Sequence, residues 1–187
     1  MDYNLFREFP ACALKNLHQL RYIYFSSQNI ESVNINDLVL NSLQMIDLRQ
    51  NKISNFSISN INNINRIQIH LENNDITYLN ISRVNRIHTL SVQKNQLVEV
   101  HQNIFQNSHS TLVNLDLSYN YLDDEVWKVF EGITAVTTLK LKQNRLQTVS
   151  PSVITRLSEL HHLDLSHNYI TSLTDVLLRS EKLPAFV

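Results

Sequence analysis

The chain has 187 residues, 43% of them hydrophobic, and a formal net charge of −1 from 16 basic and 17 acidic residues. This length and composition predict one folded domain with a sizeable core, and the balanced charge argues against a nucleic-acid partner. No apolar run reaches the ~20 residues that span a bilayer, and the opening MDYNLFREFP has no basic start followed by an apolar run, so it does not resemble a signal peptide.

An eleven-residue pattern, L-x-x-L-x-L-x-x-N-x-L with small changes, recurs seven times along the chain. Its copies begin 21 to 25 residues apart, at residues 20, 43, 66, 87, 112, 136 and 160. In the x-L-x-L-x core, alternate residues point to opposite faces, so each copy predicts a short strand with its leucines inward. We expect strands near residues 22–26, 45–49, 68–72, 89–93, 114–118, 138–142 and 162–166. They form a single domain over residues 1–187, with seven full repeats and a partial repeat at each end.

The ninth place of the pattern holds asparagine in six of the seven copies. An asparagine amide both donates and accepts hydrogen bonds, so at this turn it can satisfy backbone groups of its own coil and of the next. Gln28 takes this place in the first copy, and its longer side chain predicts a local distortion there. The predicted structural ladder comprises Asn51, Asn74, Asn95, Asn120, Asn144 and Asn168.

The repeated pattern resembles that of the leucine-rich repeat family. This resemblance implies an α/β solenoid, a horseshoe with short parallel strands on the concave face and short helices or irregular turns on the convex face. Residues 4–20, NLFREFPACALKNLHQL, are similar to the 24-residue subtype found in extracellular animal proteins, such as Toll-like receptor ectodomains and insect leucine-rich immune proteins. Cysteine-rich flanking caps are absent, however, and the third and fourth repeats also fit the shorter intracellular subtype.

The segments that connect the strands begin with one that carries Cys12, the single cysteine of the chain. One cysteine cannot form an internal disulfide, and we expect it to be a small buried residue. Residues 54–86 are rich in Asn, Ile and Ser, and because Asn and Ser compete with helix formation, irregular structure is expected there.

Helices are expected later in the chain. Asp123 or Asp124 caps the first, which contains Trp127 as a packing residue and is followed by Gly132 in the left-handed conformation. A second begins with Ser150 as its cap and proline in the first helical position. Thr174 would cap a third.

Both ends of the chain fall inside a repeat. Residues 1–3 align with a strand, and Leu183 and Phe186 take inward places after the last full copy. An open solenoid end exposes hydrophobic core. We therefore expect a fragment, an incomplete gene product, or a chain whose ends are capped by further repeats or by a partner.

Solvent-facing places on neighbouring strands form two candidate binding surfaces. In the fifth place, Lys140 lies between two carboxylates, which gives either a salt ladder on the surface or a charged recognition strip. Aromatic side chains mark the opposite end of the face. The predicted concave contacts are Tyr22, Tyr24, Arg49, Asn114, Asp116, Tyr119, Lys140, His162, Asp164 and His167.

The sequence offers little for chemistry. A single glycine argues against phosphate-binding loops and nucleophile elbows, so we expect no enzyme and no cofactor. His161, His162 and His167 surround Asp164, yet the repeat places them at a strand entrance, on a strand and at a turn. They do not converge on one ion, so no metal site is predicted.

The family resemblance implies a secreted or cell-surface module that recognises a protein partner or an extracellular ligand, in innate immunity or adhesion. Two glycosylation sequons, at Asn55 and Asn80, agree with that setting. The alternative is a cytoplasmic scaffold or adaptor, such as a regulatory subunit or a ubiquitin-ligase substrate receptor.

Overall fold

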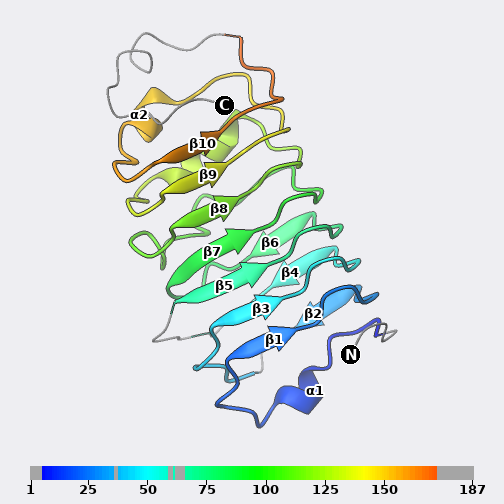
Figure 1. Cartoon of the computed structure of the whole chain (residues 1–187). Coiled ribbons are helices and arrows are strands. Elements are labelled where there is room, and N and C mark those ends of the chain that lie inside the picture. The colour runs from blue at the N-terminus through cyan, green and yellow to red at the C-terminus, as the bar shows by residue number, and fades with distance from the viewer. Residues whose placement is uncertain (1–5, 36–37, 59–60, 62–65, 172–187) are drawn as a thin grey trace.

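In a computed structural model, the chain forms a parallel-strand solenoid, described over residues 6–35, 38–58, 61 and 66–171 (Figure 1). One strand per coil joins a seven-stranded parallel sheet of order β1-β3-β5-β7-β8-β9-β10. Its strands are β1 (Tyr22–Tyr24), β3 (Met45–Asp47), β5 (Ile67–His70), β7 (Ile87–Ser91), β8 (Asn114–Asp116), β9 (Thr138–Lys140) and β10 (His162–Asp164). Each overlaps the range expected from the repeat, and the predicted fold class is confirmed.

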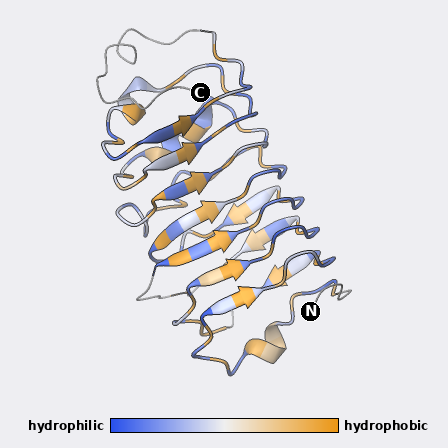
Figure 2. Cartoon of the chain, in the orientation of Figure 1, coloured by the Kyte–Doolittle hydropathy of each residue, from blue (hydrophilic) through white to orange (hydrophobic). Residues whose placement is uncertain are grey.

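Alternation of apolar and polar residues explains why these segments are strands. In β8, Leu115 is buried between two partly exposed residues, and Leu139 and Leu163 continue the same inward column in β9 and β10. The hydrophobic core lies behind the sheet and runs along the solenoid axis, so that each coil packs on its two neighbours (Figure 2).

A second, three-stranded parallel sheet lies on the convex side: β2 (Ser32–Asn34), β4 (Asn55–Ser57) and β6 (Tyr78–Asn80) (Figure 1). The expectation of irregular structure over residues 54–86 was therefore wrong for these segments. Each strand buries one apolar residue, Val33, Phe56 or Leu79, between polar ones. The three coils also have equal lengths of 23 residues between matching positions, which keeps the strands in register.

Short helices cover the rest of the convex side: α1 (Ala11–Leu14), the 3₁₀-helix η1 (Asp124–Phe130) and α2 (Pro151–Ile154). Asp123 caps η1, accepting a hydrogen bond from the Glu125 N–H at 3.0 Å. Trp127 packs in the core, and its Nε1–H donates to the Thr148 carbonyl at 3.1 Å.

Two turns of these convex segments differ in how well they match expectation. Gly132 follows η1 with φ +85°, where an added Cβ would lie 2.9 Å from His109 Cε1, which accounts for a glycine at this position. Ser150 stands at the N-cap of α2 without a side-chain capping bond. Cys12 is exposed, so its predicted burial was wrong, because α1 turns no fully buried side chain toward the core. The helix expected after Thr174 and the terminal half-repeats lie outside the described residues.

The asparagines at the ninth place tie each coil to the one before it. The Asn120 amide donates to the carbonyls of Val92, Leu117 and Ser118 at 3.0–3.2 Å, and its Oδ1 accepts from the Leu97 N–H at 3.0 Å. The bonds thus reach the preceding coil, whereas the sequence analysis assigned them to the following one. The same set recurs at Asn51, Asn74, Asn95, Asn144 and Asn168.

The residue before each ladder position has a left-handed backbone, a feature that the sequence analysis missed. None of these residues is glycine, although a positive φ costs an L-residue about 1 kcal/mol or more. The left-handed residues are Ser27, Gln50, Asn73, Lys94, Tyr119, Gln143 and His167. The first copy differs at the ladder place itself: Gln28 donates to the Ser26 carbonyl, and its buried Oε1 has no hydrogen-bond partner, so the amide is used incompletely there.

Candidate functional site

The charged strip of the concave face lies on β8, β9 and β10. Lys140 stands opposite Asp116 on one side and Asp164 on the other in the strand register. Its Nζ lies 3.7 Å from Asp116 Oδ2, and the lysine side chain is 42% exposed, so this ion pair contributes about 1 kcal/mol or less to stability. The strip therefore remains accessible to a partner.

Asp164 is held by its own turn. Its Oδ1 accepts hydrogen bonds from the Ser166 N–H at 3.0 Å and from the Ser166 hydroxyl at 2.7 Å. Burial alone would raise the pKa of Asp164, but these bonds and the charges of Lys142 and His162 lower it. The carboxylate is thus fixed in its charged form beside the exposed His162.

The remaining predicted contacts of this end are arranged around the strip. Asn114 donates weakly to Thr89 Oγ1 at 3.4 Å, and His162 is exposed opposite Thr138. Tyr119 and His167 project at the turns that follow β8 and β10, with φ +58° and +57°. Tyr119 lies between two lysines, with Lys94 Nζ and Lys142 Nζ 5.8 and 5.9 Å from its ring centre.

The opposite end of the face carries the predicted aromatic pair. Tyr22 and Tyr24 are 49% and 60% exposed, and their rings stack with centres 6.4 Å apart. The Tyr22 hydroxyl donates to Gln44 Oε1 at 2.8 Å. The third predicted contact, Arg49, binds a neighbouring carboxylate, with Nε and Nη2 at 2.9 and 2.6 Å from the two oxygens of Asp47.

Asp47 is the most buried acid of this face, at 3% exposure. Burial on its own would raise the pKa of Asp47. The hydrogen bonds and charge of Arg49, with a smaller contribution from His70, more than offset that effect, and the pKa is lowered. Asp47 and Arg49 thus act together as a buried brace between the first coils.

This brace predicts a specific acid sensitivity. Because the pKa of Asp47 is lower in the folded chain than the unfolded value near 4, the carboxylate stabilises the fold above about pH 4, and this contribution is lost as the pH falls below that value. We expect Asp47→Asn to lower the unfolding temperature at pH 7 and to flatten its decline between about pH 5 and 3. Asp75→Asn, at an exposed acid, is the control. Parallel pH profiles for Asp47→Asn and the unmodified chain would contradict this role.

Glu72 belongs to a polar hollow that the sequence analysis missed. Its Oε1 lies 3.4 Å from His70 Nδ1, while its buried Oε2 has no hydrogen-bond partner. The hollow has a volume of about 270 Å³ and opens beside Arg49, Gln50 and Asn73. The seventh place of the pattern, where arginine and glutamate follow one another, was the available signal.

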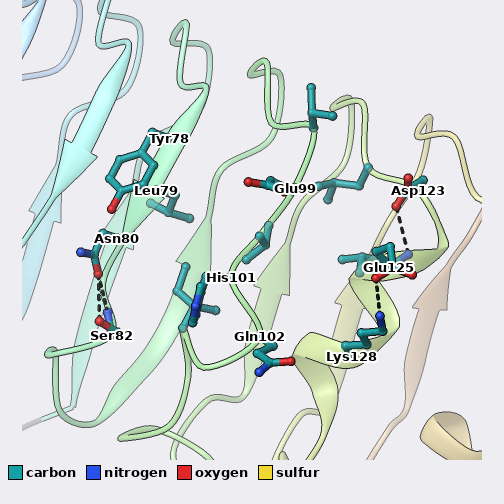
Figure 3. Close-up of a pocket in the computed structure, with 15 residues that line it drawn as sticks. Tyr78, Leu79, Asn80, Ser82, Glu99, His101, Gln102, Asp123, Glu125 and Lys128 are labelled. Atoms are coloured by element: carbon teal, nitrogen blue, oxygen red, sulfur yellow. Dashed lines mark hydrogen bonds and ion pairs between the residues drawn. The ribbon is translucent and has the colours of Figure 1, made fainter.

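A larger pocket of about 640 Å³ lies on the convex side between β6 and η1 (Figure 3). Glu99, His101 and Gln102, from the coil between these elements, line its floor. Asn80, one of the two sequon asparagines, stands at its edge, where its Oδ1 accepts from the Ser82 N–H at 3.3 Å and hydroxyl at 2.9 Å. Asn55, the other, is exposed at the start of β4.

Two further kinds of site were sought in the described part of the chain. No group of three His, Cys, Asp or Glu side chains there is placed to hold a metal ion. His161 Nδ1 lies 2.6 Å from the Glu159 carbonyl instead of facing the other histidines. Among these same residues, no helix has both the length and the apolar character to cross a membrane.

Comparison with known proteins decides the family. The profile described as "Leucine rich repeat" matches residues 85–146 and 134–183, which together span more than half of the chain. The chain belongs to the leucine-rich repeat family. Family members with this solenoid fold are typically non-catalytic binding modules.

Curated relatives match only part of this leucine-rich repeat chain. Leucine-rich repeat and fibronectin type-III domain-containing protein 4 of Rattus norvegicus is 35% identical over 69 residues, which are 37% of this chain and 11% of that protein. Leucine-rich repeat and fibronectin type III domain-containing protein 1 of Danio rerio is 30% identical over 78 residues, 42% of this chain and 13% of that protein. The chain thus matches a small fraction of each relative's length.

Solved structures share the fold over almost the whole chain. An internalin from Listeria monocytogenes aligns with a TM-score of 0.60 and 20% identity, covering 96% of this chain and 57% of its own. Toll, in the Drosophila Toll–Spatzle complex, aligns with a TM-score of 0.59 and 19% identity, covering 97% and 28%. These likenesses establish the leucine-rich repeat solenoid.

Proposed function

We propose that this chain is a non-catalytic recognition module of a secreted or cell-surface protein, of the innate-immune or adhesion type, that binds a protein partner or extracellular ligand on its concave strand face. The observation that carries the proposal is the accessible strip on β8–β10. Asp116, Lys140 and Asp164 hold opposite charges side by side on a rigid sheet, and aromatic and histidine side chains flank them. Such a mixed surface gives a partner both charge complementarity and adaptable contacts.

Replacing Asp116, Lys140 and Asp164 together by alanine tests this strip. The chain would be screened by surface plasmon resonance against an array of extracellular domains, and the affinity of each bound domain measured again with the triple variant. We expect a loss of about tenfold or more, because three rim and strip charges are removed at once. Glu125, Lys128 and Glu131, which are exposed on and just after η1, supply the matched control with the same charges. Equal affinity of both triple variants would exclude the strip as the contact surface.

We further propose that Asn55 and Asn80 carry N-linked glycans, which only chains on the secretory route receive. Secretion from cultured animal cells should give a mass that falls after removal of N-glycans, by one glycan's mass in Asn55→Gln or Asn80→Gln and wholly in the double variant. A chain that keeps its unmodified mass in the medium would contradict the glycosylation. A chain that is retained and active only in the cytoplasm would favour the scaffold alternative.

A further inference from the structure

A basic and aromatic surface lies beside the concave face, along the turns that leave the last four full strands. We call it the turn-edge patch and define it by Lys94, Tyr119, Tyr121, Lys142, Arg145 and Tyr169. These residues occupy the seventh, eighth and tenth places of the patterns at residues 87–97, 112–122, 136–146 and 160–170. None of those places holds Asp or Glu in these four copies.

The distribution of charge along the solenoid is uneven. In the second and third copies, the same three places carry Arg49 and Lys52 together with Glu72 and Asp75, so positive and negative charges balance. In the last four copies they carry three cations without a carboxylate. The excess of positive charge is therefore confined to one edge of the C-terminal half, although the whole chain is nearly neutral.

The packing holds two of these cations close together. Lys94 and Lys142 come from the coils on either side of Tyr119, and each ammonium lies within 5.9 Å of the centre of the tyrosine ring. The coils are joined there by backbone hydrogen bonds from Lys94 N to Ser118 O and from Tyr119 N to Lys142 O, at 2.9 and 2.8 Å. The two like charges are thus fixed around one ring.

The carboxylates closest to this pair in the pattern belong to the strand face and have other partners. Asp116 faces Lys140, and Asp164 accepts both hydrogen bonds of Ser166, although its charge also interacts with Lys142. The field of Lys94 is left for an external anion.

Arginine and tyrosine side chains extend the patch. The guanidinium of Arg145 stacks over Tyr121 at 4.8 Å from the ring centre, which fixes its plane and leaves its N–H groups for a carboxylate. Tyr121 and Tyr169 are 45% and 66% exposed. Tyrosine and arginine are the residues that most often dominate binding energy at protein interfaces.

We propose that the turn-edge patch binds an acidic peptide segment of a partner protein, its carboxylates facing Lys94, Lys142 and Arg145 while its apolar atoms lie on the tyrosines. This rests on the proposed recognition function but places the contact at the turns, outside the strand strip. Three cations on a nearly neutral chain are few for a phosphate polymer, whose affinity is dominated by charge. The exposed tyrosines instead fit a polypeptide.

The test uses a fluorescently labelled peptide of ten glutamates, with a peptide of ten glutamines for comparison, and measures anisotropy at low and moderate salt. The unmodified chain should bind the glutamate peptide, more weakly as salt rises. The triple variant K94E/K142E/R145E should lose at least about tenfold in affinity. The matched control K15E/K52E/R156E makes the same change in net charge at exposed cations elsewhere and should bind within about twofold of the unmodified chain.

Circular dichroism and thermal unfolding establish that each variant is folded, and Tyr119→Ala, which changes no charge, gives a second test with an expected severalfold loss. Absence of glutamate-peptide binding, equal losses in the two triple variants, or equal binding of the glutamine peptide would overturn the proposal. Binding of heparin but not of the glutamate peptide would also overturn it, in favour of a polyanion site. The strand-strip alanine variant should keep the peptide, so that failure of the strand-face proposal is separately visible.

Discussion

Replacement of Asn120 by alanine is expected to lower the free energy of unfolding by about 2–4 kcal/mol. The amide makes four hydrogen bonds at a site that is 5% exposed, three to carbonyls and one from the Leu97 N–H. Alanine leaves that N–H without an acceptor and three carbonyls without their shared donor, in a place that water reaches poorly. Urea unfolding followed by circular dichroism measures the loss.

Two further variants separate the hydrogen bonds from the effect of shortening a side chain. Asn114→Ala removes an asparagine that makes one long contact on the partly exposed strand face, and it should cost less than about 1 kcal/mol. Asn120→Asp keeps the acceptor but places a negative charge beside three carbonyl oxygens, so it should destabilise the chain at least as much as alanine at pH 7. If Asn114→Ala and Asn120→Ala were equally costly, the ladder would have no special structural role.

The ladder also shows how far the sequence could go. A fixed nine-residue offset within the pattern identified each asparagine and its hydrogen-bonding capacity, because period and chemistry are both local properties. Which neighbouring coil the amide reaches depends on the handedness and rise of the solenoid, which no single repeat encodes. The side chain of Asn51 therefore reached Phe25 in the coil before it, and not the coil after.

The candidate surfaces were predicted with the same mixture of success and failure. Register follows from the repeat, so Asp116, Lys140 and Asp164 are neighbours as expected. Contacts along one strand do not follow from it. Arg49 was expected to face solvent, yet it binds Asp47 two residues earlier, since a buried carboxylate needs a counter-charge within reach.

The convex sheet is the part of the fold that the sequence analysis missed. Strands of three residues carry too little alternation to be seen in one segment, and they form because three successive coils of equal length align Val33, Phe56 and Leu79 side by side. The next copies begin 21 and then 25 residues later, and this change of length coincides with the end of the sheet at β6. Coil length, and not composition, decides the convex structure here.

Phe56 gives the second large effect that we expect. It is the central buried side chain of the convex sheet, with no exposed surface, and truncation to alanine should cost about 3–5 kcal/mol in unfolding free energy through lost burial and the cavity left behind. Phe56→Leu, which fills most of the volume, should cost about 1.5 kcal/mol or less. Tyr78→Ala removes a ring of similar size that is 56% exposed on the neighbouring strand and should change stability much less. Similar losses for Phe56→Ala and Tyr78→Ala would contradict this account of the sheet.

The position of the effect along the chain is as informative as its size. In a solenoid each coil packs on its neighbours, so a cavity at Phe56 weakens the coils that carry β2, β4 and β6 more than distant ones. Amide hydrogen exchange should therefore speed up in residues 46–58 and 67–81 of Phe56→Ala, while β9 and β10 keep protection closer to that of the unmodified chain. Uniform loss of protection would show instead that the coils unfold as one unit. In that case the strand strip and the turn-edge patch would depend on the stability of the N-terminal coils, and variants there would weaken binding without touching either surface.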